Sequence, residues 1–221
     1  MEYDIPDTGF DRIATLDIET THFKPRQGEV ISIGVGVHDR GQPGETADYE
    51  LFHRTDPSVE NEQDLIRDAI SHLNNVDADG LVTYNGKSFD MGFLRDRMEL
   101  NNAQMPLVFL DEDDTHVDLI EPRKQRCRRT NEDWPSLEGC LESYGLPVPS
   151  TIWAGDELTN VRFGEELGPA YLDALANGGV DDLSPVVEHY LRTDLEANFA
   201  VYYSDIGVEF KPALLDSVSE F

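Results

Sequence analysis

Apolar residues in the first half of the chain occur in short runs with the spacing of β-strands. The longest run, residues 30–37 (VISIGVGV), is far shorter than a membrane span and suits a buried strand. Residues 47–53 alternate polar and apolar side chains, as a half-buried strand does. The pattern predicts five strands, at residues 12–17, 29–38, 47–53, 80–84 and 116–120.

Helical spacing of apolar residues appears after the third predicted strand. Leu65, Ile66, Ala69, Ile70 and Leu73 recur every three or four residues and predict a helix over residues 60–73. Further helices are predicted at residues 89–100 with Ser88 as N-cap, 136–144 closing at Gly145, 165–176 and 185–203. This order of elements predicts an α/β fold with a mixed five-stranded central sheet and helices on both faces. We expect one domain over residues 1–221, with a core of about residues 12–203 and short terminal extensions.

The charge balance of the chain is extreme. Acidic residues number 45 against 17 basic ones, which gives a formal net charge of −28. Such a chain repels itself in dilute buffer, and salt relieves the repulsion because the Debye length falls to about 3 Å at 1 M. The acidic residues are spread over many segments, so we expect a halophile-like protein adapted to a salt-rich cytoplasm. Because salt screens the repulsion, the net charge does not exclude a polyanionic substrate.

Cysteine usage and the N-terminal residues narrow the class further. Cys127 and Cys140 form no CxxC pair, and the six histidines form no HExxH motif, which argues against a disulfide framework and a thiolate zinc site. The first ten residues are acidic and lack the features of a signal peptide. A soluble cytoplasmic protein without a membrane partner is therefore expected.

Two carboxylates alternate along the first predicted strand, in LDIETT (residues 16–21). Side chains on a strand point to opposite faces in turn, so Asp17 and Glu19 share one face and Leu16, Ile18 and Thr20 share the other. Neighbouring carboxylates repel, and aspartate is disfavoured in strands. A hard divalent cation such as Mg²⁺ would offset this cost because it prefers oxygen ligands. A strand that ends in solvent with both acids hydrated is the alternative.

A further acidic residue follows the fourth predicted strand, in YNGKSFD (residues 84–90). Asn-Gly is a common hairpin turn, but the helical pattern that follows favours a strand-to-helix junction. Asp90 then lies in the first helical turn, near the edge where open α/β sheets bind ligands. We expect Gly86 to let a substrate backbone approach closely.

The last predicted helix contains HYLRTD, residues 189–194. Residues four apart on a helix differ by about 40° around its axis, and residues five apart by about 140°. Tyr190 and Asp194 therefore share a face, whereas His189 would have to leave the regular helix to join them. A core tyrosine and an incidental exposed histidine are the structural alternatives.

Taken together, these motifs resemble those of the DEDD superfamily of ribonuclease-H-like 3′–5′ exonucleases. The matching positions are Asp17, Glu19, Asp90 and Asp194, in the same order along the chain. YNGKSFD, the later HVDLI and the YxxxD ending look most like the YprB-like branch of predicted exonucleases. The resemblance covers about residues 12–203 and implies a ribonuclease-H-like fold.

The resemblance also implies a site for two Mg²⁺ or Mn²⁺ ions, about 3.5–4 Å apart. Asp17, Glu19 and Asp194 would hold the ion that binds the nucleophilic water. Asp17 would also share the other ion, which Asp90 would hold indirectly and which would stabilise the leaving 3′ oxygen. Tyr190 or His189 would assist the water. A tyrosine pKa near 10 suits orientation, while a histidine could accept the proton. Helix geometry and the branch both favour Tyr190.

Residues expected to contact the substrate lie near these motifs. The segment RKQRCRR (residues 123–129) holds five of the 17 basic residues, and phosphate contact is favoured over a solvated loop. The predicted contacts are Asn85, Lys87, Arg123, Lys124, Arg126, Arg128 and Arg129, with Arg95, Phe89 and Trp134 as weaker candidates. Asp118 in HVDLI is expected to act indirectly or structurally rather than as a metal ligand, and His116 is expected to be incidental.

The expected function is a Mg²⁺- or Mn²⁺-dependent exonuclease that removes nucleotides from a nucleic-acid 3′ end, with a single strand or 3′ end as its partner. One alternative is a non-hydrolytic module that binds nucleic acid or protein and keeps the fold, and another is a related metal-dependent endonuclease. The intact set of four carboxylates argues against the first, and the YxxxD ending argues against the second.

Overall fold

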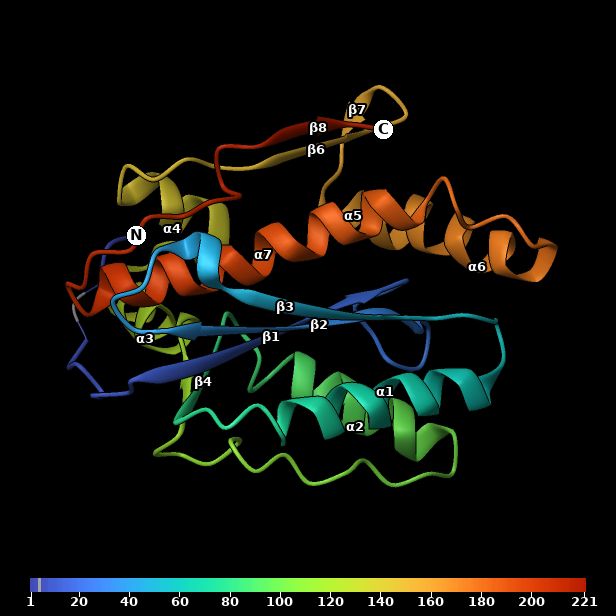
Figure 1. Cartoon of the computed structure of the whole chain (residues 1–221), viewed down its shortest axis with the longest axis horizontal. Coiled ribbons are helices and arrows are strands. Elements are labelled where there is room, and N and C mark those ends of the chain that lie inside the picture. The colour runs from blue at the N-terminus through green and yellow to red at the C-terminus, as the bar shows by residue number, and fades with distance from the viewer. Residues whose placement is uncertain (4) are drawn as a thin grey trace.

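A mixed sheet of five strands runs through the middle of the molecule (Figure 1). The computed structural model describes residues 1–3 and 5–221. The strands are β1 (Arg12–Thr20), β2 (Val30–Asp39), β3 (Asp48–His53), β4 (Gly80–Thr83) and β5 (His116–Asp118). Their spatial order is β3-β2-β1-β4-β5, with β1, β2 and β3 antiparallel and β1, β4 and β5 parallel. The predicted α/β fold with a mixed five-stranded sheet is confirmed.

Helices cover both faces of this sheet, as predicted (Figure 1). Helices α1 (Val59–Leu73) and α2 (Asp90–Leu100) pack on one face, where Leu16 and Ile18 of β1 enter the same core cluster as Leu65 and Leu94. Helix α7 (Ser184–Asp205) runs along the other face. The alternation of side chains on β1 therefore places Leu16 and Ile18 away from α7.

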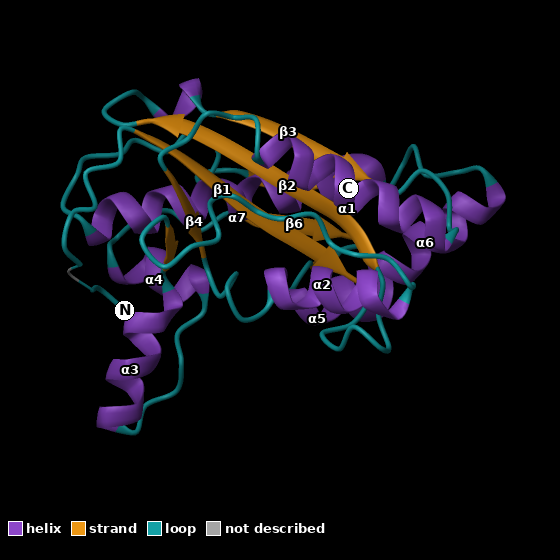
Figure 2. Cartoon of the chain, turned by 90° about the horizontal axis from the view of Figure 1, so that it is seen from below, coloured by secondary structure: helices purple, strands orange, loops and turns teal. Residues whose placement is uncertain are grey.

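Shorter helices follow the sheet in the second half of the chain. They are α3 (Ile120–Thr130), α4 (Leu137–Ser143), α5 (Asn160–Arg162) and α6 (Gly168–Asn177), with a π turn at Phe163–Leu167. A 3₁₀ turn at Gly44–Thr46 lies earlier, between β2 and β3. Helix α3 projects from the body beside the N-terminus (Figure 2). Ser136 caps α4, because its hydroxyl accepts from the Gly139 N–H.

The predicted N-cap of α2 is wrong. Phe89 occupies the N-cap position, and the Ser88 hydroxyl instead donates to Asn85 Oδ1 at 2.8 Å. The side chain of Asn85 therefore competes with the helix end for the serine. The helix begins one residue later than a serine cap would place it.

A small second sheet was not predicted. It consists of β6 (Ser150–Trp153), β7 (Asp156–Glu157) and β8 (Val218–Glu220) in the order β7-β6-β8, and it lies beyond α7 (Figure 1). Its strands have two to four residues, too few to show a period. The C-terminal residues expected to form a loose extension thus pair with β6. Within the described residues, no helix combines the length and hydropathy needed to cross a membrane.

Candidate active site

The acidic pair of β1 lies beyond the end of the neighbouring parallel strand. The ladder between β1 and β4 joins residues 13–15 to residues 80–82, whereas Asp17 and Glu19 are opposite Gly34 and Ser32 of β2. A shift of register between Glu19 and Thr20 ends the regular pairing. The two carboxylates therefore stand at the C-terminal edge of the parallel strands, where ligands bind to open α/β sheets.

Helix α7 reaches these carboxylates because β2 carries a glycine at their level. A Cβ on Gly34 would lie only 2.7 Å from Leu195 Cδ1 and 3.0 Å from Leu191 Cγ. The absence of a side chain lets α7 pack directly on the strand. Asp194, which lies between these two leucines in sequence, is thereby brought over Asp17.

Three carboxylates converge at this point. Asp17, Glu19 and Asp194 each offer a carboxylate oxygen, and these atoms all lie within 4.8 Å of one another. Glu19 is buried, and Asp17 and Asp194 are partly exposed. The structure thus brings together the three residues assigned to one metal ion in the sequence.

Asp90 enters the same cavity from the start of α2, and its position depends on the turn before it. Asn85 adopts a left-handed conformation with φ 70°. The Asp118 carboxylate accepts the N–H groups of Asn85 at 2.7 Å and of Lys87 at 3.1 Å. Asp118 therefore fixes the turn that leads into Asp90, in agreement with the indirect role expected for it.

Gly86 in this turn packs closely on Thr83. A Cβ there would lie 2.3 Å from the Thr83 hydroxyl oxygen and 2.5 Å from Thr83 Cβ. Thr83 Oγ1 is in turn 2.9 Å from His116 Nε2, whose Nδ1 is 2.7 Å from Asp111. The glycine is required by packing inside the protein, and His116 belongs to that packing and does not line the cavity over the carboxylates.

A cavity of about 490 Å³ opens over the four acidic residues Asp17, Glu19, Asp90 and Asp194. Its apolar lining includes Phe23, Phe89, Leu137 and Val161, and Asn85 also lines it. Phe23 is 66% exposed and stacks on His22, with ring centroids 4.4 Å apart. The cavity is therefore lined both by carboxylates and by an exposed aromatic ring.

Removal from water raises the pKa values of all four carboxyl groups. Burial is the largest cause in each case, and it raises the pKa of Asp17 to about 7. Mutual repulsion adds to it: Asp17 raises the pKa values of Glu19, Asp90 and Asp194. Ionising these groups therefore costs free energy, and no lysine or arginine among the described residues that line the cavity offsets it.

The donor set fits hard divalent cations. Carboxylate oxygens are the ligands that Mg²⁺ and Mn²⁺ prefer, and three of them already lie within 4.8 Å of one another. Asp90 Oδ2 is buried and has no hydrogen-bond partner among the described residues. A buried polar atom without a partner is costly, and a cation would satisfy it.

Tyr190 and His189 are separated by the helix, as their spacing predicts. The Tyr190 ring is 7% exposed, and its hydroxyl donates to Asn160 Oδ1 at 2.6 Å. His189 points toward the second sheet, where its ring nitrogens lie 2.7 Å from Thr151 Oγ1 and 3.1 Å from Ser217 Oγ. Neither residue lines the cavity over the four carboxylates. Tyr190 lines a neighbouring cavity together with Asp194, whereas both nitrogens of His189 are already engaged.

The family model of the RNase_H superfamily matches residues 14–147. The chain belongs to the RNase_H superfamily. The matched segment contains Asp17, Glu19 and Asp90, while Tyr190 and Asp194 lie beyond its end. No curated protein matches the chain.

The comparison with solved structures gives similarities at low sequence identity, and the one with a TM-score above 0.5 supports the fold of this superfamily member. The family B DNA polymerase of the archaeon Pyrobaculum calidifontis has a TM-score of 0.51 and 15% identity, over 93% of this chain and 26% of the polymerase. An E. coli exonuclease I complex with a 5cy-dT13 oligonucleotide has a TM-score of 0.41 and 14% identity, over 81% of this chain and 42% of that one. The chain thus spans less than half the length of either structure.

The basic segment of this RNase_H member does not face the cavity as a unit. It forms most of α3, and Arg123 is fully buried in a bidentate pair with Asp205, with distances of 2.7 and 2.6 Å. The prediction that Arg123 contacts substrate is therefore wrong, because its guanidinium is buried and paired with Asp205. The exposed side chains of the segment, Arg126, Arg128 and Arg129, do not line the cavity.

The two lysines predicted to contact substrate each interact with another side chain of the protein. Lys124 Nζ donates to Asn85 Oδ1 at 2.8 Å and lies 5.1 Å from the centre of the exposed Trp134 ring. Lys87 Nζ is 3.8 Å from Asp113. Neither lysine lines the cavity, although Asn85, to which Lys124 is bound, does.

Sequence reasoning missed Glu138 and Asn160. Glu138 lies in the first turn of α4, lines the cavity, and raises the pKa values of Asp17, Asp194 and Tyr190. Both residues stand on short helices next to capping residues, Ser136 and Thr159. The capping residues could have indicated that helices begin there. Nothing in the sequence indicated which way those helices face.

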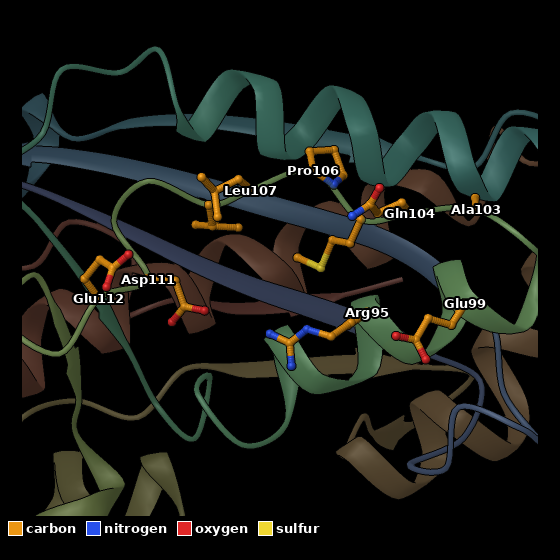
Figure 3. A pocket seen from close by; sticks show the side chains of 10 residues that line it. Arg95, Glu99, Ala103, Gln104, Pro106, Leu107, Asp111 and Glu112 are labelled. Carbon is orange, nitrogen blue, oxygen red and sulfur yellow. The ribbon is translucent and has the colours of Figure 1, made fainter.

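A separate cavity of about 350 Å³ lies between α2 and residues 103–112 (Figure 3). It is lined by Arg95, Glu99, Leu107 and Asp111, among others. The carboxylates of the candidate site do not line it. Arg95 therefore faces a different part of the surface from the one predicted for a substrate contact.

Proposed function

We propose that the chain is a two-metal-ion-dependent 3′–5′ exonuclease that hydrolyses phosphodiester bonds at nucleic-acid 3′ ends. The observation that carries the proposal is the convergence of Asp17, Glu19 and Asp194 within 4.8 Å, beside the unpaired oxygen of buried Asp90. Membership of the RNase_H superfamily supports nuclease chemistry at this place. The polarity rests on the order of the motifs and on the YxxxD ending.

The four acidic residues would divide between two ions. Asp17, Glu19 and Asp194 would hold one, and Asp17 together with Asp90 would hold the other. Divalent ions so bound would lower the pKa of a bound water and neutralise charge on the scissile phosphate. Asp118 would keep Asp90 in place through the turn at residues 85–87.

The cavity lining supports a dependence on metal for binding the phosphate. Within the described chain, none of the residues that line the cavity is lysine or arginine. A phosphate near the six acidic side chains that line this cavity would be repelled unless cations stand between them. The substrate's charge would therefore be compensated by ions rather than by basic side chains.

The same lining supports a single-stranded 3′ end as substrate. The cavity has an apolar wall, against which an unpaired base would pack. The exposed Phe23 ring at its edge would stack on an unpaired base, and such stacking is worth about 1–3 kcal/mol. Lys24, which lies over the Phe23 ring at 5.1 Å, would approach the backbone.

The experiment is digestion of 3′- and 5′-labelled single strands with Mn²⁺ in molar KCl. We expect the 5′-labelled strand to shorten stepwise, and Asp17→Ala to reduce the rate by at least about 100-fold, more than loss of an indirect metal partner costs. Asp11→Ala is the matched control, because Asp11 is exposed and immediately precedes β1. It should retain the wild-type rate.

Three outcomes would contradict the proposal in different ways. Hydrolysis that survives Asp17→Ala would remove the catalytic assignment. Cleavage of a circular single strand would indicate an endonuclease. Oligonucleotide binding without hydrolysis in the wild type would indicate the non-hydrolytic module.

A further inference from the structure

The hydroxyl of Tyr190 is held by a residue outside the acidic set. It donates to Asn160 Oδ1 at 2.6 Å, and the Tyr190 ring stacks on Phe163 with centroids 5.8 Å apart. The ring is nearly buried, so its direction is fixed by packing. The one remaining freedom of the side chain is the direction of the hydroxyl proton, and Asn160 sets it.

Asn160 stands between two cavities. The larger contains the carboxylates, and a second of about 350 Å³ lies on the side of Tyr190 and β6. Asn160, Glu138, Val161 and Asp194 line both. Asn160 thus touches the space in which a water next to Asp194 would lie.

The segment that carries Asn160 is anchored by the small second sheet. Arg162 donates to the carbonyls of Asp156 at 2.9 Å and Glu157 at 3.0 Å, and to the Glu166 carboxylate at 2.9 Å. Thr159 caps the same short helix. These contacts tie α5 to the β6–β7 hairpin, so Asn160 keeps its place although its own side chain is exposed.

We propose that Asn160 is a positioning residue, which takes up the hydroxyl proton of Tyr190 in a hydrogen bond and leaves the phenol's lone pairs directed at the nucleophilic water. This inference rests on the proposed function. A phenol has one proton to donate. While the Tyr190 hydroxyl donates its proton in the hydrogen bond to Asn160, it can only accept a hydrogen bond from the water. A water that donates to Tyr190 turns its own lone pair toward the phosphorus.

Without Asn160, the Tyr190 hydroxyl is free to donate to the water instead. It would then occupy the lone pair needed for attack. The hydrogen bond between Tyr190 and the water would remain, but its direction would reverse. The loss should therefore appear in the rate of the chemical step and not in substrate binding.

The test is a double-mutant cycle with Tyr190→Phe, measured as kcat and KM on a 5′-labelled strand with Mn²⁺. Asn160→Leu should lower kcat by about 10–100-fold, as is typical for residues that orient a metal site, with KM unchanged. Asn160→Asp keeps an acceptor of the same shape and should retain kcat. In the Tyr190→Phe background, Asn160→Leu should cause no further loss, because there is no proton left to direct.

Several results would overturn the inference. Additive losses in the double variant would show that Asn160 acts independently of Tyr190. A loss in Asn160→Asp as large as in Asn160→Leu, or a change confined to KM, would remove the hydrogen-bond argument.

If the wild type does not hydrolyse the strand, the proposed function itself fails. If hydrolysis depends on Asp17 but the cycle is additive, only the role of Asn160 fails. Thermal unfolding of each variant checks that the fold is intact.

Discussion

At the scale of the residue, the candidate site stores electrostatic strain that a cation would relieve. Burial raises the pKa of Asp17 to about 7, from 3.8, and Glu138 adds repulsion. A carboxyl whose pKa is raised by folding favours the folded state while it is protonated. That contribution is fully present below about pH 4 and is lost as the pH rises through about 7. Metal-free protein should therefore become less stable across this range.

We expect Asp17→Asn to melt higher than the wild type in EDTA, with a difference that grows between pH 4 and pH 8. Mn²⁺ should raise the melting temperature of the wild type more at pH 8 than at pH 5, because ligands must be deprotonated. Free Mn²⁺ at 100 to 1,000 times its Kd would add about 2.7–4.1 kcal/mol to the free energy of unfolding. Differential scanning calorimetry in EDTA and in Mn²⁺ measures both effects.

Asp11→Asn is the control for this series, since it removes one exposed carboxylate just before the same strand. It should follow the wild type at every pH and respond to Mn²⁺ equally. A Mn²⁺ response that Asp17→Asn retains in full would mean that the ion binds elsewhere on this acidic surface.

The buried pair of Arg123 and Asp205 leads to a second prediction at the same scale. Both side chains are fully buried, and the Tyr144 hydroxyl also donates to Asp205. Arg123→Ala leaves a buried carboxylate unpaired, which typically costs about 3–5 kcal/mol. Urea unfolding should show this loss. Arg126→Ala, three residues further along α3 and exposed, should leave stability unchanged.

At the scale of the element, the site depends on how closely α7 approaches β2. A methyl group on Gly34 would meet Leu195 at 2.7 Å and Leu191 at 3.0 Å, so α7 would have to shift. The shift would move Asp194 relative to Asp17, which belongs to the neighbouring strand. Overpacking of this kind typically costs about 1–3 kcal/mol.

We therefore expect Gly34→Ala to lower both stability and the Mn²⁺-dependent rate, with weaker Mn²⁺ binding as the cause of the rate loss. The measurements are urea unfolding and the Mn²⁺ concentration for half-maximal rate. Gly92→Ala is the control, because a Cβ there meets nothing within 4 Å and alanine favours a helix. A loss of stability in Gly34→Ala without weaker Mn²⁺ binding would mean that α7 adjusts without moving Asp194.

The elements also show which parts of the molecule the sequence could reveal. The apolar run of β2 and the helical spacing of α1 are local signals, and both elements formed where they were predicted. The period of two on β1 was enough to put Asp17 and Glu19 on one face, opposite Leu16 and Ile18. These inferences needed no knowledge of distant contacts.

The features that were missed depend on contacts between distant segments. β8 has three residues and exists through pairing with β6, about 68 residues earlier in the sequence. Arg123 lies in a basic run, but its partner Asp205 is 82 residues away, so composition alone suggested a surface role. Asn160 gains its place near Tyr190 partly through the second sheet, to which Arg162 of the same short helix is hydrogen-bonded. Local pattern therefore predicted the central sheet and its acids, but not the residues that surround them.

At the scale of the whole molecule, the net charge of −28 should reverse the usual effect of salt on a nucleic-acid enzyme. Proteins that bind phosphates through lysine and arginine lose affinity as salt rises, because counterions are released on binding. Here the cavity lining lacks those residues within the described chain, and the surface repels the strand. Salt screens that repulsion, since the Debye length falls from about 10 Å at 0.1 M to about 3 Å at 1 M.

We expect KM for a single strand to fall or stay level as KCl rises from 0.1 to 2 M at constant Mn²⁺. A strand with uncharged methylphosphonate links, except at its 3′-terminal phosphodiester, is the matched control, and its KM should respond less. A KM that rises steeply with salt would show that basic residues outside the cavity, such as those exposed on α3, carry the binding. The exposed arginines of α3 would then be the first residues to replace, because their side chains face solvent outside the cavity.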